Sequence, residues 1–138
     1  MSVLKNLIRI GLVSSVNEQK GTVRVVFEDK DDMVSGDLPV LFRHSMKIKE
    51  YSLPAIREQV ACMFLGNGIQ EGLCLGSFYS LVDMPPVQDK NKHGVWFEDG
   101  SYVYYDTESG RLHVKAVSDV YIEGNLHVKG KIFTGDSS

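Results

Sequence analysis

The sequence predicts an all-β chain, in which an N-terminal five-stranded barrel of the OB type is followed by a C-terminal intertwined trimeric β-helix or β-prism. Three observations lead to this fold class. A run of alternating apolar and polar residues extends from Leu112 to Phe133. Before it, β-rich segments separated by turn signals fill about eighty residues, with one longer irregular connection. A linker with two adjacent prolines separates these two parts.

The C-terminal run keeps a single phase over its whole length. Its even-numbered positions are apolar or small, interrupted by Ser118 and two glycines, and most of its odd-numbered positions are polar. A period of two indicates β-structure. A compact domain would normally reset the phase at each turn. The unit Leu-His-Val-Lys-small occurs at 112–116 and again at 126–130, which favours a winding architecture with stacked segments.

The remaining material on the chain that could cover this strip is short and polar. We therefore expect three copies to associate around a common axis with the even-numbered side chains inside. The alternation does not fix the side of the strands on which Val95 and Phe97, the first two residues of this expected core, lie. A long edge hairpin on an ordinary β-sandwich is the alternative from pattern alone. The expected trimer core consists of Val95, Phe97, Leu112, Val114, Val120, Ile122, Leu126, Val128 and Ile132.

The chain divides into four predicted segments. Residues 1–9 are expected to form a short amphipathic helix or arm, and residues 83–92 a linker. Residues 93–138 form the predicted prism segment, which opens with a hairpin at Asp99-Gly100 and a further turn at 107–110. Residues 10–82 form the predicted OB domain, with strands at 10–16, 22–27, 38–42, 60–65 and 73–79.

Composition and charge favour a folded protein without a nucleic-acid partner. The chain is 43% apolar, and its net charge is −3, whereas a nucleic-acid-binding surface is basic. The start of the chain does not read as a secretory signal, and no stretch is apolar enough for a membrane span, so we expect folding in a cytoplasm. Cys62 and Cys74 lie in apolar runs without C-x-x-C spacing, which favours buried thiols over a disulfide or a metal pair.

No catalytic, metal or cofactor constellation emerges, and we expect no enzyme. The carboxylates of residues 28–32 lack the ligand spacing of a calcium loop and read as a solvated turn. The four histidines show no ligand spacing either. The second function class is an OB-fold module that binds nucleic acid or glycan, for which Arg24 and Arg43 are the candidate cations. The loops around both arginines are acidic.

Several segments together resemble phage baseplate assembly protein V, the family of central spikes of contractile tails. Equivalent proteins of bacteriocin-like particles and the C-terminal half of type VI secretion spikes are similar. The likeness spans residues 8 to 133. The order and spacing of the motifs together carry it. The segments that carry it are Leu53 to Val60, Phe64 to Gly68, Gly72 to Ser80, Pro85-Pro86 and His93 to Ser101.

The resemblance implies a homotrimeric hub or spike that joins the tail tube, hub and baseplate wedge proteins to the tip. It implies assembly in the bacterial cytoplasm and a place in a virion or tailocin-like particle that acts on the target cell envelope. Longer family members carry a His-x-His pair at an iron-bound apex. Here His113 and His127 stand alone at odd positions, so no metal ligand is transferred. We expect a stubby prism, on the order of 30 Å long, with a possible separate tip protein on it.

Overall fold

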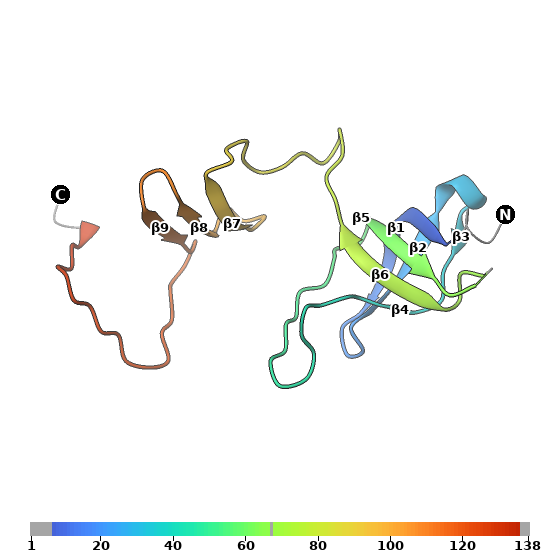
Figure 1. Ribbon diagram of the computed structural model, residues 1–138, viewed down its shortest axis with the longest axis horizontal. Coiled ribbons are helices and arrows are strands. Elements are labelled where there is room, and N and C mark those ends of the chain that lie inside the picture. The colour runs from blue at the N-terminus through green and yellow to red at the C-terminus, as the bar shows by residue number, and fades with distance from the viewer. Residues whose placement is uncertain (1–6, 67, 136–138) are drawn as a thin grey trace. The chain divides into compact units, whose positions relative to one another are not determined.

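The structure, a computed structural model, describes residues 7–66 and 68–135, in which the regular structure is β-strand with a 3-10 turn at Glu28–Lys30. The chain divides into two compact units, Met1–Met84 and Pro85–Ser138, and each holds an antiparallel sheet (Figure 1). The predicted all-β class is confirmed. The elements are β1 (Ile8–Asn17), β2 (Thr22–Phe27), η1 (Glu28–Lys30), β3 (Met33–Val34), β4 (Leu38–Pro39), β5 (Gln59–Phe64), β6 (Gly72–Ser77), β7 (Lys92–Trp96), β8 (Tyr102–Asp106) and β9 (Arg111–Lys115).

In the N-terminal unit the sheet follows the order β3-β2-β1-β5-β6, with β4 also paired to β2. β1 and β2 form the predicted hairpin, whose last register pair is Asn17 with Thr22. The Asn17 side chain accepts hydrogen bonds from the amides of Gln19 and Lys20, each at 3.1 Å, and so closes the turn. β5 and β6 form the second predicted hairpin.

The predicted third strand is shorter than residues 38–42. It pairs with β2 only at Leu38 and Pro39. Val40 then forms a parallel bridge to Cys74, and the Leu41 amide donates to the Cys74 carbonyl at 2.9 Å. The Val40 amide still donates to the Gly21 carbonyl at 3.0 Å, so the chain changes partner at this residue. Residues 38–41 therefore connect β2 with β6 through hydrogen bonds.

The helix predicted within residues 1–9 is wrong for the last two of these residues. Ile8 and Arg9 belong to β1, where they pair with Met63 and Cys62 of β5. Ladder hydrogen bonds to β5 outweigh the weak tendency of so short a segment to be helical. Residues 1–6 of that prediction lie outside the described residues.

The core of the N-terminal unit comes mainly from alternate positions of β2 and β5, as a half-buried sheet requires, and single residues of β1, β4, β6 and the loop before β6 complete it. The rings of Phe27 and Phe64 meet edge to face at 5.7 Å between centroids. The Arg9 guanidinium lies over both rings, 5.8 and 5.9 Å from their centroids, which keeps its charge in favourable contact with aromatic faces. The buried cluster comprises Val13, Val23, Val25, Phe27, Leu38, Val60, Cys62, Phe64, Ile69 and Cys74.

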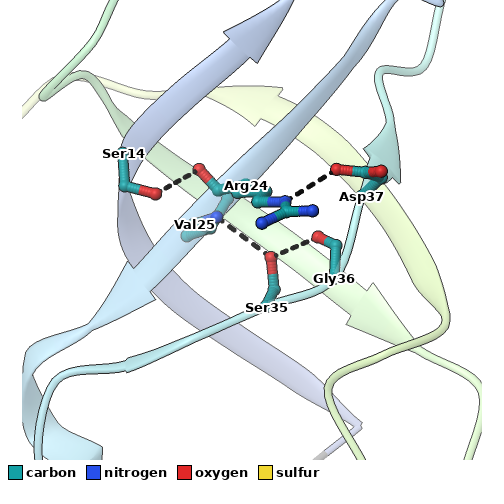
Figure 2. A network of polar contacts seen from close by, with 6 residues as sticks. All are labelled: Ser14, Arg24, Val25, Ser35, Gly36 and Asp37. Atoms are coloured by element: carbon teal, nitrogen blue, oxygen red, sulfur yellow. Dashed lines mark hydrogen bonds and ion pairs between the residues drawn. The ribbon is translucent and has the colours of Figure 1, made fainter.

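Polar contacts tie the connection between β3 and β4 to the edge of β2, as Figure 2 shows. The buried Ser35 hydroxyl accepts from the Val25 amide at 3.0 Å and donates to the Gly36 carbonyl at 2.8 Å. Next to it, Arg24 Nε donates to Asp37 Oδ1 at 2.8 Å. Both contacts fix the path of residues 35–37, which lead into the segment that crosses from β2 to β6.

In the C-terminal unit, β7, β8 and β9 form a meander, so both predicted turns are confirmed. The predicted continuation of β-structure to Phe133 is not formed within one chain. The strand ends at Lys115, and residues 116–134 follow an open path without a strand (Figure 1, orange to red). A strand needs a neighbouring backbone to satisfy its amides and carbonyls, and in the described part of the chain no strand pairs with residues 116–133, hereafter the tail strip.

Candidate functional site

The sheet of the C-terminal unit has two chemically different faces. The register places Val95 beside Val103 and Val103 beside Val114, so these valines share one face. Alternation along the strands adds Tyr105 and Leu112 to it. We call these five residues the apolar face. The register thus puts Val95 on the same side as Leu112 and Val114, which the sequence pattern alone left open.

Within the C-terminal unit, the described residues leave the apolar face uncovered. The exposed fraction is 55% for Val95, 66% for Leu112 and 52% for Val114, and Val103 and Tyr105 are also exposed. Phe97, which ends the predicted first strand of this unit, is exposed as well. Large aliphatic side chains that meet on one face of a sheet are the usual signature of a surface that another protein copy or partner covers.

The apolar side chains of the tail strip are exposed as well. All five of its predicted core residues are exposed, from Val128 at 46% to Ile132 at 74%. The odd-numbered Val117, Tyr121 and Phe133 are exposed too, so within one chain neither side of the strip is buried. The nine residues predicted from sequence as a trimer core are therefore all accessible: Val95, Phe97, Leu112, Val114, Val120, Ile122, Leu126, Val128 and Ile132.

The opposite face of the sheet carries a row of stacked rings. The Trp96 and Tyr104 rings lie 5.3 Å apart, and Tyr104 stacks on His113 at 4.7 Å. Lys92 Nζ lies 5.4 Å from the Tyr104 ring. These side chains cover one another, so this face, in contrast to the apolar face, is largely satisfied by contacts within the chain.

Gly94 makes this stacking possible. It pairs with Tyr104 across β7 and β8, and a Cβ added there would lie 2.1 Å from the Val103 carbonyl oxygen and 2.5 Å from Tyr104 Cα. Backbone atoms at these distances leave no room for any side chain. The hairpin therefore requires glycine at this position.

Gly94→Ala is expected to destabilise the C-terminal unit by about 1–3 kcal/mol through this overlap. The single tryptophan of the chain, Trp96, lies in β7, so its fluorescence during urea unfolding reports on this sheet. Gly68→Ala is the matched control, because Gly68 lies in the N-terminal unit and a Cβ there would meet only the Gln70 amide nitrogen, at 4.0 Å. Equal unfolding midpoints for the two variants would contradict the assigned register.

Two aspartates fasten the turns of this sheet. Asp106 Oδ1 accepts from the amide of Glu108 at 2.9 Å, and Asp99 Oδ1 accepts from the amide of Ser101 at 2.9 Å. These hydrogen bonds favour the ionised carboxylate. The amide of Glu108 lowers the pKa of Asp106 below its usual value, and the amide of Ser101 does the same to the pKa of Asp99.

This gives the turns a defined pH dependence. Because the folded pKa of Asp106 lies below its unfolded value, its contribution to stability is present above the unfolded value, near 4, and is lost as the pH falls through the folded pKa. We expect Asp106→Asn to melt below the parent chain at pH 6 and the two melting temperatures to converge toward pH 2. A constant difference across this range would mean that the charge of Asp106 plays no part.

The N-terminal unit offers less for a binding site. A surface hollow of about 480 Å³ is lined by Thr22, Arg24 and Asp37 among others, but the Arg24 guanidinium is paired with Asp37. Arg43 is likewise held by the carboxylate of Glu50. Both cations that the sequence offers for nucleic acid thus have acidic partners, and the two pairs lower the pKa of Asp37 and of Glu50.

Within residues 7–66 and 68–135, no three His, Cys, Asp or Glu side chains gather where they could hold a metal ion. No helix in this part of the chain is long and apolar enough to cross a bilayer.

Sequence reasoning missed two members of the apolar face, Val103 and Tyr105. The signal was available: the Asp99-Gly100 turn fixes the register of the hairpin, and that register pairs Val95 with Val103. Both residues extend the predicted apolar surface across all three strands.

Comparisons with known proteins add no assignment. No protein-family model matches the chain, and a search of curated proteins finds no significant relative. A functional assignment therefore depends on the residues and their geometry.

Proposed function

We propose that this chain is a structural protein, the homotrimeric central spike or hub of a contractile-tail baseplate in a phage, a tailocin or a related injection particle. The observation that carries the proposal is the uncovered apolar surface of the C-terminal unit. It spans the apolar face and the tail strip, and its aliphatic residues recur with a period of two. Each such side chain gains roughly 1.5–3 kcal/mol on burial.

A second copy of the same strip supplies what each chain lacks. The tail strip needs backbone partners for its amides and carbonyls and apolar partners for its aliphatic groups, and an identical strip offers both. Three strips are the smallest set that can enclose an axis with one face of each turned inward. In that arrangement the apolar face and the even-numbered residues of the tail strip form the shared core, and the stacked rings of Tyr104 and His113 face outward.

The connectivity of the N-terminal unit supports an OB-type barrel in this assembly. β1 pairs with both β2 and β5, β5 pairs with β6, and residues 38–41 join β2 to β6. A small Greek-key barrel closed through a short third strand would have this strand order. Such a unit beside a trimeric prism agrees with the family that residues 8–133 resemble.

The proposed mechanism is mechanical. A trimer without open strand edges transmits force along its axis with every backbone group paired. The hub would pass the thrust of the contracting sheath from the tail tube and baseplate wedges to a tip, which meets the envelope of the target cell. No bond is made or broken in this process, so the working parts are surfaces.

The test is complementation in the bacterium that makes the particle. With the coding sequence deleted, electron microscopy is expected to show tails without a baseplate spike. The wild-type chain and Val117→Asp should restore the spike, whereas Ile122→Asp should not, because only position 122 lies in the proposed core. Normal, infective or bactericidal particles in the absence of the chain would refute the proposal.

A further inference from the structure

Cys62 and Cys74 are direct cross-strand partners between β5 and β6. Both thiols are free, and both side chains are fully buried in the same core cluster. We propose that this pair is a reversible oxidation site, at which a peroxide converts the two thiols into a disulfide that links β5 to β6. The proposal does not depend on the proposed function.

The backbone directions place the two cysteines in a non-hydrogen-bonded pair. The amide of Phe64 donates to the Leu7 carbonyl at 2.7 Å, and Cys62, two residues earlier in β5, faces β1 in the same way and pairs with Arg9. The Cys74 carbonyl accepts from Leu41 at 2.9 Å and so points away from β5. In such a pair the Cα atoms lie about 4.5 Å apart, within the span that a disulfide bridges.

A bulge beside Cys74 gives the strand room to adjust. The register passes from Ala61 with Gly76 directly to Cys62 with Cys74, so Leu75 is an extra residue on β6. Gly76 adopts a φ of 134°, which glycine tolerates and other residues rarely do, and no atom lies within 4 Å of its Cβ position. The local bend of a bulged strand lets Cys74 shift toward Cys62 without breaking the rest of the hairpin.

The two thiols also differ in reactivity. Their mutual hydrogen bond raises the pKa of Cys62 and lowers the pKa of Cys74, so Cys74 is the first of the two thiols to ionise while the pair is in contact. The Cys74 thiolate attacks one peroxide oxygen, breaks the O–O bond and becomes a sulfenic acid as hydroxide leaves. The Cys62 sulfur then displaces hydroxide from that sulfenic acid. In total, two thiols and one hydrogen peroxide give one disulfide and two water molecules.

The expected consequence is that the disulfide between β5 and β6 forms only outside a reducing compartment. Cytoplasmic thiol buffers keep such a pair reduced while the chain folds. After release into an oxidising medium, the bond would join the two ends of the segment between Cys62 and Cys74, one side of the core of the N-terminal unit. This protects the segment from local opening and proteolysis.

The experiment treats the folded full chain with a small excess of hydrogen peroxide at 37 °C, denatures it, adds N-ethylmaleimide and measures intact mass. We expect a monomeric chain two hydrogen atoms lighter that takes up no maleimide, and dithiothreitol should restore two reactive thiols. Cys62→Ala and Cys74→Ala should form no internal disulfide. Oxygen atoms added to exposed methionines such as Met46 are assigned separately by peptide mapping. For the wild-type chain, two maleimides after treatment, oxygen atoms added to Cys62 or Cys74, or disulfides between chains would each overturn the proposal.

Discussion

Ile122→Asp is expected to leave the purified chain monomeric. Ile122 is 57% exposed in the single chain, and in the proposed trimer three copies of it meet around the axis. Losing three buried isoleucines removes about 4.5–9 kcal/mol, which is over a thousandfold in the association constant. Three like charges in an apolar core add a further penalty. Sedimentation velocity at micromolar concentration measures the result.

Val117→Asp is the matched control for this variant. It places the same new charge on an exposed aliphatic residue of the tail strip, where Val117 is 61% exposed, but at an odd position that faces outward in the proposed trimer. We expect Val117→Asp to sediment like the wild-type chain. If both variants dissociated equally, the assignment of inner and outer faces by alternation would be wrong.

Phe64→Ala is expected to destabilise the N-terminal unit by about 3–5 kcal/mol. Phe64 is fully buried, and its ring packs on Phe27 at 5.7 Å and under the Arg9 guanidinium at 5.9 Å. Truncation leaves a cavity and removes both contacts. Hydrogen exchange of the amides of β1, β2 and β5 measures the loss, because these strands surround the site.

Phe133→Ala is the comparison for this loss. Phe133 is 86% exposed, so the same truncation there removes no core packing, and the exchange rates of the N-terminal strands should not change. A Phe64→Ala effect below about 1 kcal/mol would mean that the ring does not lie in a well-packed core.

Local patterns predicted the N-terminal unit well where the signal is short-ranged. The alternation of Val23, Val25 and Phe27 marks β2, and the Asn17 turn closes its hairpin. The change of partner at Val40 could not be predicted, because it depends on Cys74, thirty-four residues away in sequence (74 minus 40). The same holds for Ile8 and Arg9, whose strand conformation depends on pairing with β5.

In the candidate site, too, short-range patterns predicted some residues, and others depended on pairing between strands. The pattern identified Leu112 and Val114 as one apolar side, whereas the membership of Val103 depended on the register set across the β7–β8 hairpin. The strip beyond Lys115 has the period of a strand but forms none in one chain, since sequence periodicity gives the side that must be covered and not the partner that covers it. The partner is the part that a single chain cannot supply.

The mass of the purified chain in solution, by light scattering coupled to size exclusion, tests the central claim most directly. A single chain has a mass of 15.4 kDa. The account predicts a stable species of about 46 kDa, three times 15.4 kDa, with Trp96 and the tail strip protected from hydrogen exchange. A well-folded monomer of 15.4 kDa at micromolar concentration would contradict it.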